Sequence, residues 1–408
     1  MKILLVKSYP KLTSIKPLAV GLKEIGHDVH ILVNREHPDC KKMRDIGIFV
    51  HIIDISFNPL FSRISRIPKI MKIIISFVML INRHSFDVIN FNLANARFYG
   101  RIASLFSKKT IIVSTIHGFE MKNENITGYI DDFTVCVSNS VKNYFISNSK
   151  KTNVKTIYNG IDFKKIGNIS TDKLYLHKEL GLKLETRIIG MVAYFYAFHS
   201  KGHKVFLDAA KIICQKFDFV KFAIVGSDIH GGRYEKYFQD YAKKIGVEKN
   251  VYFLGEREDA LSLMGSFYIH VLPTKTEGCP MVIIEAMSKM TPNIASDIDP
   301  IKEMIIDGKS GFLFEKENSY SLAKKIEVLL NNLGLAKEMA ISGYKQLENN
   351  FNYQRMVFEY EKLFKELCFK KPKRNRMLKI VKFSLFFSSF IIYDNLRRCL
   401  RFTKKGIK

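Results

Sequence analysis

The sequence predicts an α/β protein with two domains, each built on a parallel β-sheet, followed by a basic, apolar helical tail. The chain has 408 residues, which is enough for two hydrophobic cores. Short apolar runs alternate with helical stretches in both halves, as strands alternate with crossover helices in parallel sheets. A polar stretch at roughly residues 164–183 separates the two series and predicts a linker.

The first series of apolar runs predicts a domain at residues 1–165. Its expected strands are residues 3–6, 29–33, 49–53, 88–91, 110–115 and 133–137. The turn after the first strand contains no GxGxxG, which argues against a dinucleotide-binding oxidoreductase. His117 follows a strand directly, so we expect it to face the cleft, because ligands bind at the carboxyl ends of parallel strands. A hydrogen-bonded structural histidine is the alternative.

The second series predicts a domain at residues 166–350. Its expected strands are residues 188–193, 220–225, 251–254 and 267–272, and residues 322–369 are helical by pattern. Two such domains that face each other leave a cleft, which is the usual place for a ligand.

Residues 273–292 read as a tight turn followed by a helix, with Pro280 at the first helical position. Gly278 has no Cβ to hold a ligand off the backbone, and the free N–H groups at the helix start form an anion site suited to phosphate. Glu277 and Glu285 lie on either side, where they can accept hydrogen bonds from hydroxyls. A sugar nucleotide has this layout, although glutamates also stabilise ordinary helix starts.

The stretch Thr276-Glu277-Gly278-Cys279-Pro280-Met281-Val282-Ile283-Ile284-Glu285-Ala286-Met287 resembles the signature of retaining glycosyltransferases of family four, which have the GT-B fold. Residues 292–296 and 308–314 continue the pattern, and the resemblance covers about residues 1–369. It implies transfer of a hexosyl or N-acetylhexosaminyl group from a UDP- or GDP-linked sugar to an acceptor hydroxyl. It also implies a crossover helix at residues 351–369 that returns to the first domain.

The resemblance assigns roles to individual residues. The implied catalytic residues are His117 and Glu277, and the implied donor-binding residues are Tyr194, Lys201, Arg257, Gly278, Cys279, Pro280, Met281, Val282 and Glu285. Lys201 matches the phosphate-binding segment of the family, but Tyr194 stands where the family has an arginine. Lys201 could also be one solvated lysine among many. The DxD pair formed by Asp297 and Asp299 precedes a proline and predicts a turn, so we expect no metal or other cofactor.

The composition is that of a globular protein except for the net charge of +26, which favours a membrane surface, nucleic acid or a phosphorylated substrate. Six cysteines without a CxxC pair predict free thiols and a reducing cytoplasm. We expect no signal peptide, and no charge-free apolar run reaches the length of a transmembrane helix.

Two segments combine basic and apolar residues, as helices lying on an anionic membrane do. In residues 61–82, basic residues recur every third position between isoleucines. Residues 370–408 contain 13 lysines or arginines and one aspartate around an 11-residue apolar block. The alternatives are a crossover helix with snorkelling lysines for the first segment, and packing on the first domain or a nucleic-acid arm for the second. We expect no nucleic-acid binding, because the phenylalanines of the tail form one block.

These observations predict a peripheral membrane enzyme on the cytoplasmic face that transfers sugars to a glycan or lipid-linked acceptor in the synthesis of cell-envelope polysaccharide. A sugar-nucleotide epimerase of similar fold and a non-catalytic binder of anionic membranes or nucleic acid are the alternatives.

Overall fold

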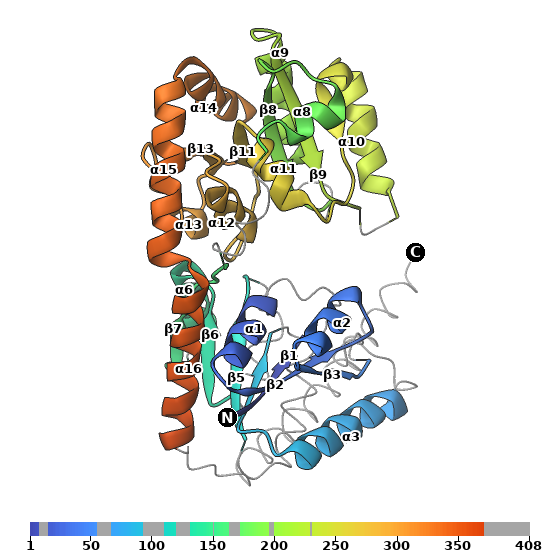
Figure 1. Cartoon of the computed structure of the whole chain (residues 1–408), viewed down its shortest axis with the longest axis vertical. Helices are drawn as coiled ribbons and strands as arrows, with labels where there is room; N and C mark the ends of the chain where they lie inside the picture. Colours follow the sequence, from blue (N-terminus) through green and yellow to red (C-terminus); the bar gives the residue numbers. More distant parts are fainter. Residues whose placement is uncertain are drawn as a thin grey trace, which may run out of the picture.

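The computed structural model describes residues 1–7, 15–54, 67–92, 110–119, 131–149, 151–162, 172–195, 200–228 and 231–370. In these residues the chain forms two α/β domains stacked along the long axis of the molecule, each with a parallel sheet at its centre (Figure 1). The predicted fold class is confirmed.

The first sheet has seven parallel strands in the order β3-β2-β1-β4-β5-β6-β7. The strands are β1 (Lys2–Val6), β2 (Asp28–Val33), β3 (Phe49–Ile52), β4 (Val88–Phe91), β5 (Ile111–Ile116), β6 (Phe133–Cys136) and β7 (Val154–Thr156). Sequence reasoning missed β7, because its three residues are only partly buried and have a lysine at their centre, so no apolar run marks it. The order is that of a doubly wound sheet, with its switch point between β1 and β4.

Helices cover both faces of this sheet. They are α1 (Lys16–Glu24), α2 (Pro38–Asp45), α3 (Ile67–His84) and α6 (Asn139–Ser149). Ile73, Phe77 and Ile81 of α3 pack on one face, where they form a buried cluster with Leu4 and Leu32 of the strands. Residues on both faces of β1, β4 and β5 are buried, as expected for a parallel sheet covered on both sides.

The second sheet has six parallel strands in the order β10-β9-β8-β11-β12-β13. They are β8 (Arg187–Val192), β9 (Val220–Val225), β10 (Val251–Phe253), β11 (Ile269–Leu272), β12 (Asn293–Ser296) and β13 (Phe312–Phe314). Its helices are α8 (Tyr175–Leu180), α9 (His203–Cys214), α10 (Arg233–Lys244), η3 (Glu248–Asn250), α11 (Ala260–Ser266), α12 (Met281–Ser288), α13 (Asp299–Lys302), α14 (Ser319–Asn331) and α15 (Leu333–Asn350). The short strands β12 and β13 were not predicted.

The final described helix, α16 (Tyr353–Lys370), leaves the second domain and packs against α1 of the first (Figure 1). A Cβ on Gly21 of α1 would lie 2.3 Å from Val357 and 3.0 Å from Tyr353 of α16, so a larger residue would push the helices apart. The Tyr353 hydroxyl also donates to the carboxylate of Glu24. The apolar face of α16 therefore belongs to the core of the first domain.

None of the described helices combines the length and the apolar character that crossing a membrane requires. Of the two basic, apolar segments predicted from sequence, residues 61–66 and 371–408 lie outside the described part of the chain.

Candidate active site

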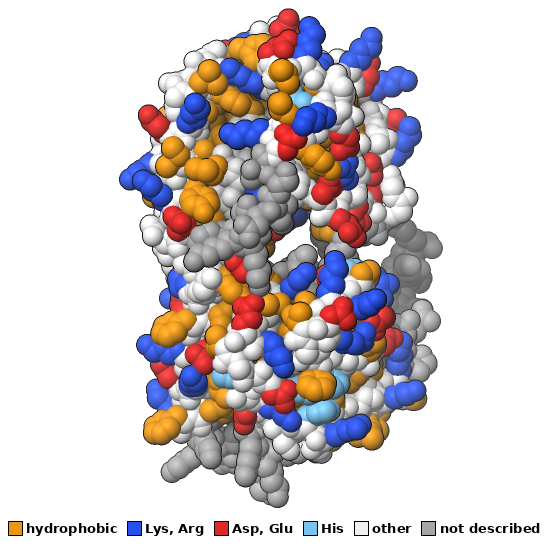
Figure 2. Space-filling view, in the orientation of Figure 1, with side chains coloured by type: hydrophobic (Ala, Val, Ile, Leu, Met, Phe, Trp, Pro, Cys, Tyr) orange, Lys and Arg blue, Asp and Glu red, His pale blue; other side chains and the backbone are white. Residues whose placement is uncertain are grey.

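The loop between β11 and α12 in the second domain lies against the end of β5 in the first. A hollow is visible between the two domains (Figure 2). A Cβ on Gly278 would lie 2.0 Å from the carbonyl oxygen of His117 and 3.1 Å from the Cα of Gly118. Only glycine allows this approach of two backbones. The sequence predicts a ligand in the space beside the Gly278 Cα. In the structure, the backbone of the first domain occupies that space. The structure thus brings the His117 and Glu277 segments together.

Helix α12 presents its N-terminus at this loop. The helix begins at Met281, and Pro280, expected as its first residue, is instead the extended N-cap residue with φ −69° and ψ 111°. No side chain among the described residues caps this N-terminus. Met281 and Val282 are partly exposed. Uncapped N–H groups carry a partial positive charge, so the N-terminus of α12 can bind an anion.

Lys201 and Glu277, predicted from separate motifs, form an ion pair of 2.5 Å between Nζ and Oε1. Two contacts hold their loops together. A Cβ on Gly202, whose φ is +77°, would lie 1.8 Å from the Pro273 carbonyl oxygen, and the Ser200 carbonyl accepts a hydrogen bond from the Lys275 amide at 2.9 Å. The ammonium and carboxylate therefore lie at the same loop as the α12 N-terminus.

Glu285 lies on α12, one turn further along the chain. Its side chain is partly exposed, and within the described residues it makes no hydrogen bond or ion pair. Burial raises the pKa of its carboxyl to about 7. An acidic group that is desolvated and lacks a protein partner is typical of a position that meets a ligand.

A chain of buried polar side chains supports His117 from within the first domain. The His117 Nε2 lies 3.1 Å from Asn92 Oδ1, and Asn92 Nδ2 donates to Asn90 Oδ1 at 3.1 Å. Thr115 Oγ1 lies 3.1 Å from both Asn90 Oδ1 and the Tyr360 hydroxyl of α16. Because the Asn92 amide nitrogen donates to Asn90, its oxygen is left to accept, and His117 Nε2 is the donor.

This network was not predicted from the sequence. The two asparagines in the run Asn90-Phe91-Asn92 could have indicated it, because buried polar residues at the end of an apolar strand need hydrogen-bond partners.

Cys279, predicted at the donor site, packs its side chain between the domains. It belongs to a buried cluster that contains Ile116 of β5 and Ile283 of α12. Burial raises the pKa of its thiol to about 12, so the thiol is neutral at pH 7. Its side chain contributes to the domain interface.

A carboxylate of the second domain caps a helix of the first. Glu303, which follows α13, accepts hydrogen bonds from the backbone N–H groups of Asn139 and Ser140 at 2.7 Å and from the Tyr158 hydroxyl at 2.6 Å. The Ser140 hydroxyl also donates to it. A negative charge at the N-terminus of α6 is favourable, so Glu303 fastens the two domains together. Sequence reasoning did not identify Glu303, because it belongs to no motif.

The remaining predicted residues follow other strands of the second sheet. Arg257 pairs with Glu179 at 2.6 Å and with Asp259 at 2.7 Å, which fastens the β10–α11 loop to α8 and lowers the pKa of Asp259 to about 2. Tyr194 follows β8 and is 41% exposed. In the DxD pair, Asp297 pairs with Lys302 at 2.9 Å, beside the start of α13.

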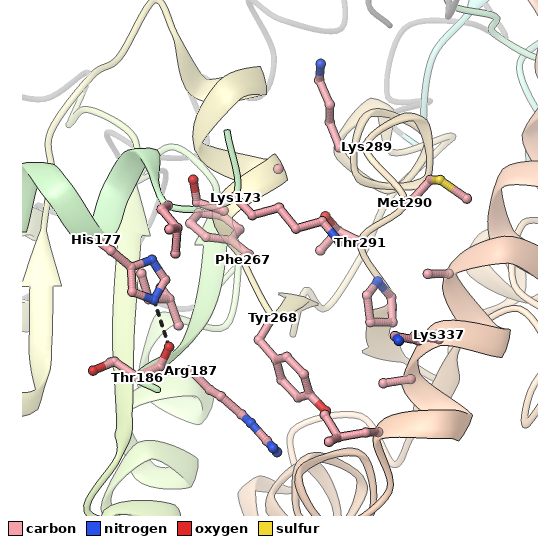
Figure 3. Close-up of a pocket in the computed structure, with 18 of the residues that line it drawn as sticks. Lys173, His177, Thr186, Arg187, Phe267, Tyr268, Lys289, Met290, Thr291 and Lys337 are labelled. Atoms are coloured by element: carbon pink, nitrogen blue, oxygen red, sulfur yellow. Dashed lines mark hydrogen bonds between the residues drawn. The ribbon is translucent and has the colours of Figure 1, made fainter. Parts of the chain in front are cut away.

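A pocket of about 460 Å³ lies at the opposite, amino end of the second sheet (Figure 3). Arg187 and Tyr268, which line it, stand at the starts of β8 and β11, and His177 Nε2 donates a 2.8 Å hydrogen bond to the Thr186 carbonyl at its rim. Ligands of parallel sheets bind at the carboxyl ends of the strands, so this pocket is not the predicted donor site.

Two parallel-sheet domains that meet at a helix N-terminus, an ion pair and a histidine have the arrangement expected of the GT-B fold. Two family models match the chain, one to each domain: Glycosyltransferase Family 4 at residues 13–165 and Glycosyl transferases group 1 at residues 172–346. The chain belongs to glycosyltransferase family 4.

Two curated relatives match along most of their length. The capsular polysaccharide biosynthesis glycosyltransferase CapM of Staphylococcus aureus is 26% identical over 365 residues, which cover 84% of this chain and 91% of CapM. The UDP-Gal:α-D-GlcNAc-diphosphoundecaprenol α-1,3-galactosyltransferase of Escherichia coli is 24% identical over 381 residues, which cover 87% of this chain and 96% of that enzyme.

Solved structures show the same fold. A glycosyltransferase from Rickettsia africae superposes with a TM-score of 0.78 at 19% identity, covering 90% of this chain and 98% of its own. Anabaena HepE in complex with UDP and glucose superposes with a TM-score of 0.75 at 20% identity, covering 90% of this chain and 99% of its own.

Proposed function

We propose that the protein transfers a sugar, with retention of configuration, from a UDP- or GDP-linked donor to a hydroxyl of a membrane-associated glycan in the synthesis of surface polysaccharide. The observation that carries this proposal is the uncapped N-terminus of α12 beside the Lys201–Glu277 ion pair. The names of the curated relatives support it, since one acts in capsule synthesis and the other uses a UDP-sugar and an acceptor linked to diphosphoundecaprenol.

The donor diphosphate would bind the free N–H groups of α12 and the ammonium of Lys201. As its charge grows on departure of the sugar, these groups stabilise it where water is scarce. Lys201 then turns from Glu277 to the phosphates, and the Glu277 carboxylate becomes free to accept hydrogen bonds from sugar hydroxyls. In the ion pair, each of the two side chains satisfies the charge of the other.

Two further side chains complete the donor site. Glu285, which has no described partner, accepts hydrogen bonds from the ribose hydroxyls. His117 contacts the sugar or a phosphate from the first domain, and its hydrogen bond to Asn92 holds the ring in place. Because these groups come from two domains, domain closure completes the site.

Helix α3 supports a membrane-associated acceptor. Met71, Ile75 and Met79 are 49%, 52% and 66% exposed, and their spacing of four residues places them on one side of the helix, opposite the side that packs on the sheet. Lys69 and Lys72 are also exposed. The helix lies at the end of the first domain that is farther from the second domain (Figure 1). An exposed apolar stripe with basic neighbours suits an anionic membrane, and we place the protein on its cytoplasmic face.

The donor is tested by thermal unfolding of the purified chain in the presence of a panel of UDP- and GDP-sugars. We expect at least one donor to raise the midpoint, because a ligand that binds only the folded state stabilises it. The Glu277→Gln variant should lose transfer to a lipid-linked acceptor, whereas Glu338→Gln, on the exposed side of α15, should not. No shift with any donor would contradict the proposal, and a new nucleotide sugar formed without acceptor would show an epimerase.

The membrane contact is tested by co-sedimentation with phosphatidylglycerol vesicles. We expect the double variant Ile75→Ser, Met79→Ser to bind more weakly by about tenfold, because each side chain loses apolar area that would enter the lipid. Ile341→Ser, which removes a similarly exposed side chain on α15, is the control. Equal binding by both variants would contradict a membrane role for α3.

A further inference from the structure

Three histidines meet at the outer edge of the first sheet. His30 lies on β2, His51 on the edge strand β3 and His84 at the end of α3. One ring nitrogen from each lies within 4.8 Å of the other two. In Figure 2, histidine side chains (pale blue) are grouped on the surface of the first domain, in the lower half of the picture. In the strand order, β1 and β4 separate the strands of this cluster from β5, after which His117 lies.

Strand register brings the first two histidines together. His30 pairs with Leu4 and Phe49, and Leu32 pairs with His51. His30, His51 and Leu32 therefore share the face of the sheet that α3 covers, because alternate residues of a strand point to the same side. The last residue of α3, His84, arrives at this face.

The three rings are arranged around a common centre. The Nδ1 of His30 lies 2.8 Å from Nε2 of His51, and the two rings are parallel, with an interplanar angle of 2°. The His84 ring is 4.9 Å from that of His30 and 5.1 Å from that of His51, tilted by 61° and 60°. Zn–N bonds of about 2.0–2.1 Å in a tetrahedral site place ligand nitrogens about 3.3 Å apart. A small adjustment would place all three nitrogens at this spacing.

The surroundings of His30 match those of a metal ligand. Its side chain is 2% exposed, and its Nε2 is buried without a hydrogen bond among the described residues. That nitrogen lies 3.3 Å from Asp28 Oδ1. Histidines that bind a metal through one nitrogen usually direct the other at a carboxylate, which orients the ring. Phe49 stacks on the His30 ring at 4.7 Å and Phe86 meets its edge at 5.0 Å, so one side of the cluster is apolar.

The charged groups near the cluster are those of Lys2, Arg83 and Asp28. Imidazole binds a metal ion in its neutral form.

We propose that His30, His51 and His84 bind a divalent transition metal ion of the zinc type. Three nitrogen ligands suit zinc and its neighbours in the transition series, whereas magnesium and calcium require oxygen ligands. The fourth position is left to water. The ion joins the edge strand β3 and the end of α3 to the centre of the sheet, so it holds in place the helix that carries the exposed Met71–Met79 stripe.

Zinc binding is measured by calorimetry on the full chain after treatment with a chelator, with ZnCl2 as the titrant. We expect one equivalent to bind. The variants His51→Gln and His84→Gln should each weaken binding by at least about 100-fold, because loss even of a residue that only orients a ligand costs about 10- to 100-fold. His51 and His84 are chosen because they are only partly buried. His37→Asn is the control, because it removes a histidine outside the cluster and keeps a good N-cap for α2.

Two further measurements test which atoms bind the metal ion and whether the ion stabilises the fold. Co2+ in place of zinc should show the visible bands of a four-coordinate site without a thiolate charge-transfer band, since all protein ligands are nitrogens. Zinc should raise the unfolding midpoint of the unmodified chain and of His37→Asn, but not of the two cluster variants. Absence of zinc binding, equal binding in the cluster variants, or a thiolate band would each overturn the proposal. Donor binding is a separate measurement, so failure here leaves the proposed sugar transfer untouched.

Discussion

Two helices start at the junction of the domains, and their N-termini are treated differently. The N-terminus of α6 receives a carboxylate from the other domain, because Glu303 accepts hydrogen bonds from Asn139 and Ser140. The N-terminus of α12 receives no side-chain cap from the described residues and instead has Lys201 and Glu277 at its loop. The same electrostatic feature thus serves as a fastening in one helix and as a candidate phosphate site in the other. The difference lies in whether the protein supplies the anion itself.

The largest effect should come from removing the positive charge beside the uncapped helix. We expect Lys201→Met to lower kcat/KM for the donor by about 100- to 1,000-fold, as loss of one group that stabilises developing negative charge does in other enzymes. The control Lys345→Met removes an exposed lysine of α15 and should leave kcat/KM unchanged. A loss of less than about threefold in Lys201→Met would show that the α12 site does not bind the diphosphate.

The second effect concerns Glu285 and pH. Its pKa is about 7 in the folded protein, whereas that of a free glutamate is about 4.3. The folded state therefore keeps its proton where the unfolded chain has lost it, so the contribution to stability is complete below about pH 4 and is lost as the pH rises to about 7. Glu285→Gln should become more stable than the unmodified chain at pH 8, by up to about 3 kcal/mol.

Urea unfolding of both proteins at about pH 5 and pH 8 measures this difference, which should grow with pH. Binding of the nucleotide sugar gives the matching functional readout. It should strengthen with pH in the unmodified chain and become weaker and independent of pH in Glu285→Gln, since only the ionised carboxylate is a full acceptor for the ribose hydroxyls. A parallel pH profile in the two proteins would exclude Glu285 from the donor site.

The third prediction concerns the N-terminus of α6, which Glu303 caps. Glu303→Gln keeps the size of the side chain but removes its charge, and we expect a loss of about 1.5–3 kcal/mol in the free energy of unfolding, the range for hydrogen bonds to charged groups. The sugar donor should still raise the unfolding midpoint of this variant, because Glu303 lies at α6 and not at α12. A full loss of donor binding at unchanged stability would mean that the two helix ends are not separate in function.

The smallest effect is that of one hydroxyl at the same place. Ser140→Ala removes the hydroxyl that donates to Glu303 and leaves the backbone donors intact. We expect a cost of about 1 kcal/mol, measured by urea unfolding. A cost as large as that of Glu303→Gln would assign the stability of this contact to the hydroxyl and not to the helix N-terminus.

Sequence reasoning identified the fold because most strands here are apolar runs, and it failed where the runs are too short, as in β7 and β13. It gave Glu277 and Glu285 as candidates because one continuous stretch carries both. Glu303 and the three histidines were missed for the opposite reason. Each acts with partners that lie far away along the chain, and only strand register and domain packing bring them together. Asn92 was missed although its partner Asn90 is two residues away.

The return of α16 to the first domain has a consequence for biosynthesis. Its residues Tyr353, Val357 and Phe364 share a core with Ile3 and Leu5 of the first strand, and its Tyr360 reaches the polar network behind His117. A ribosome has made some 350 residues before this helix emerges, so the domain translated first waits, with an uncovered apolar face, for a segment translated after the other domain. Cutting the gene between the domains would therefore leave the leading half in need of a chaperone, and supplying α16 as a separate peptide should restore it.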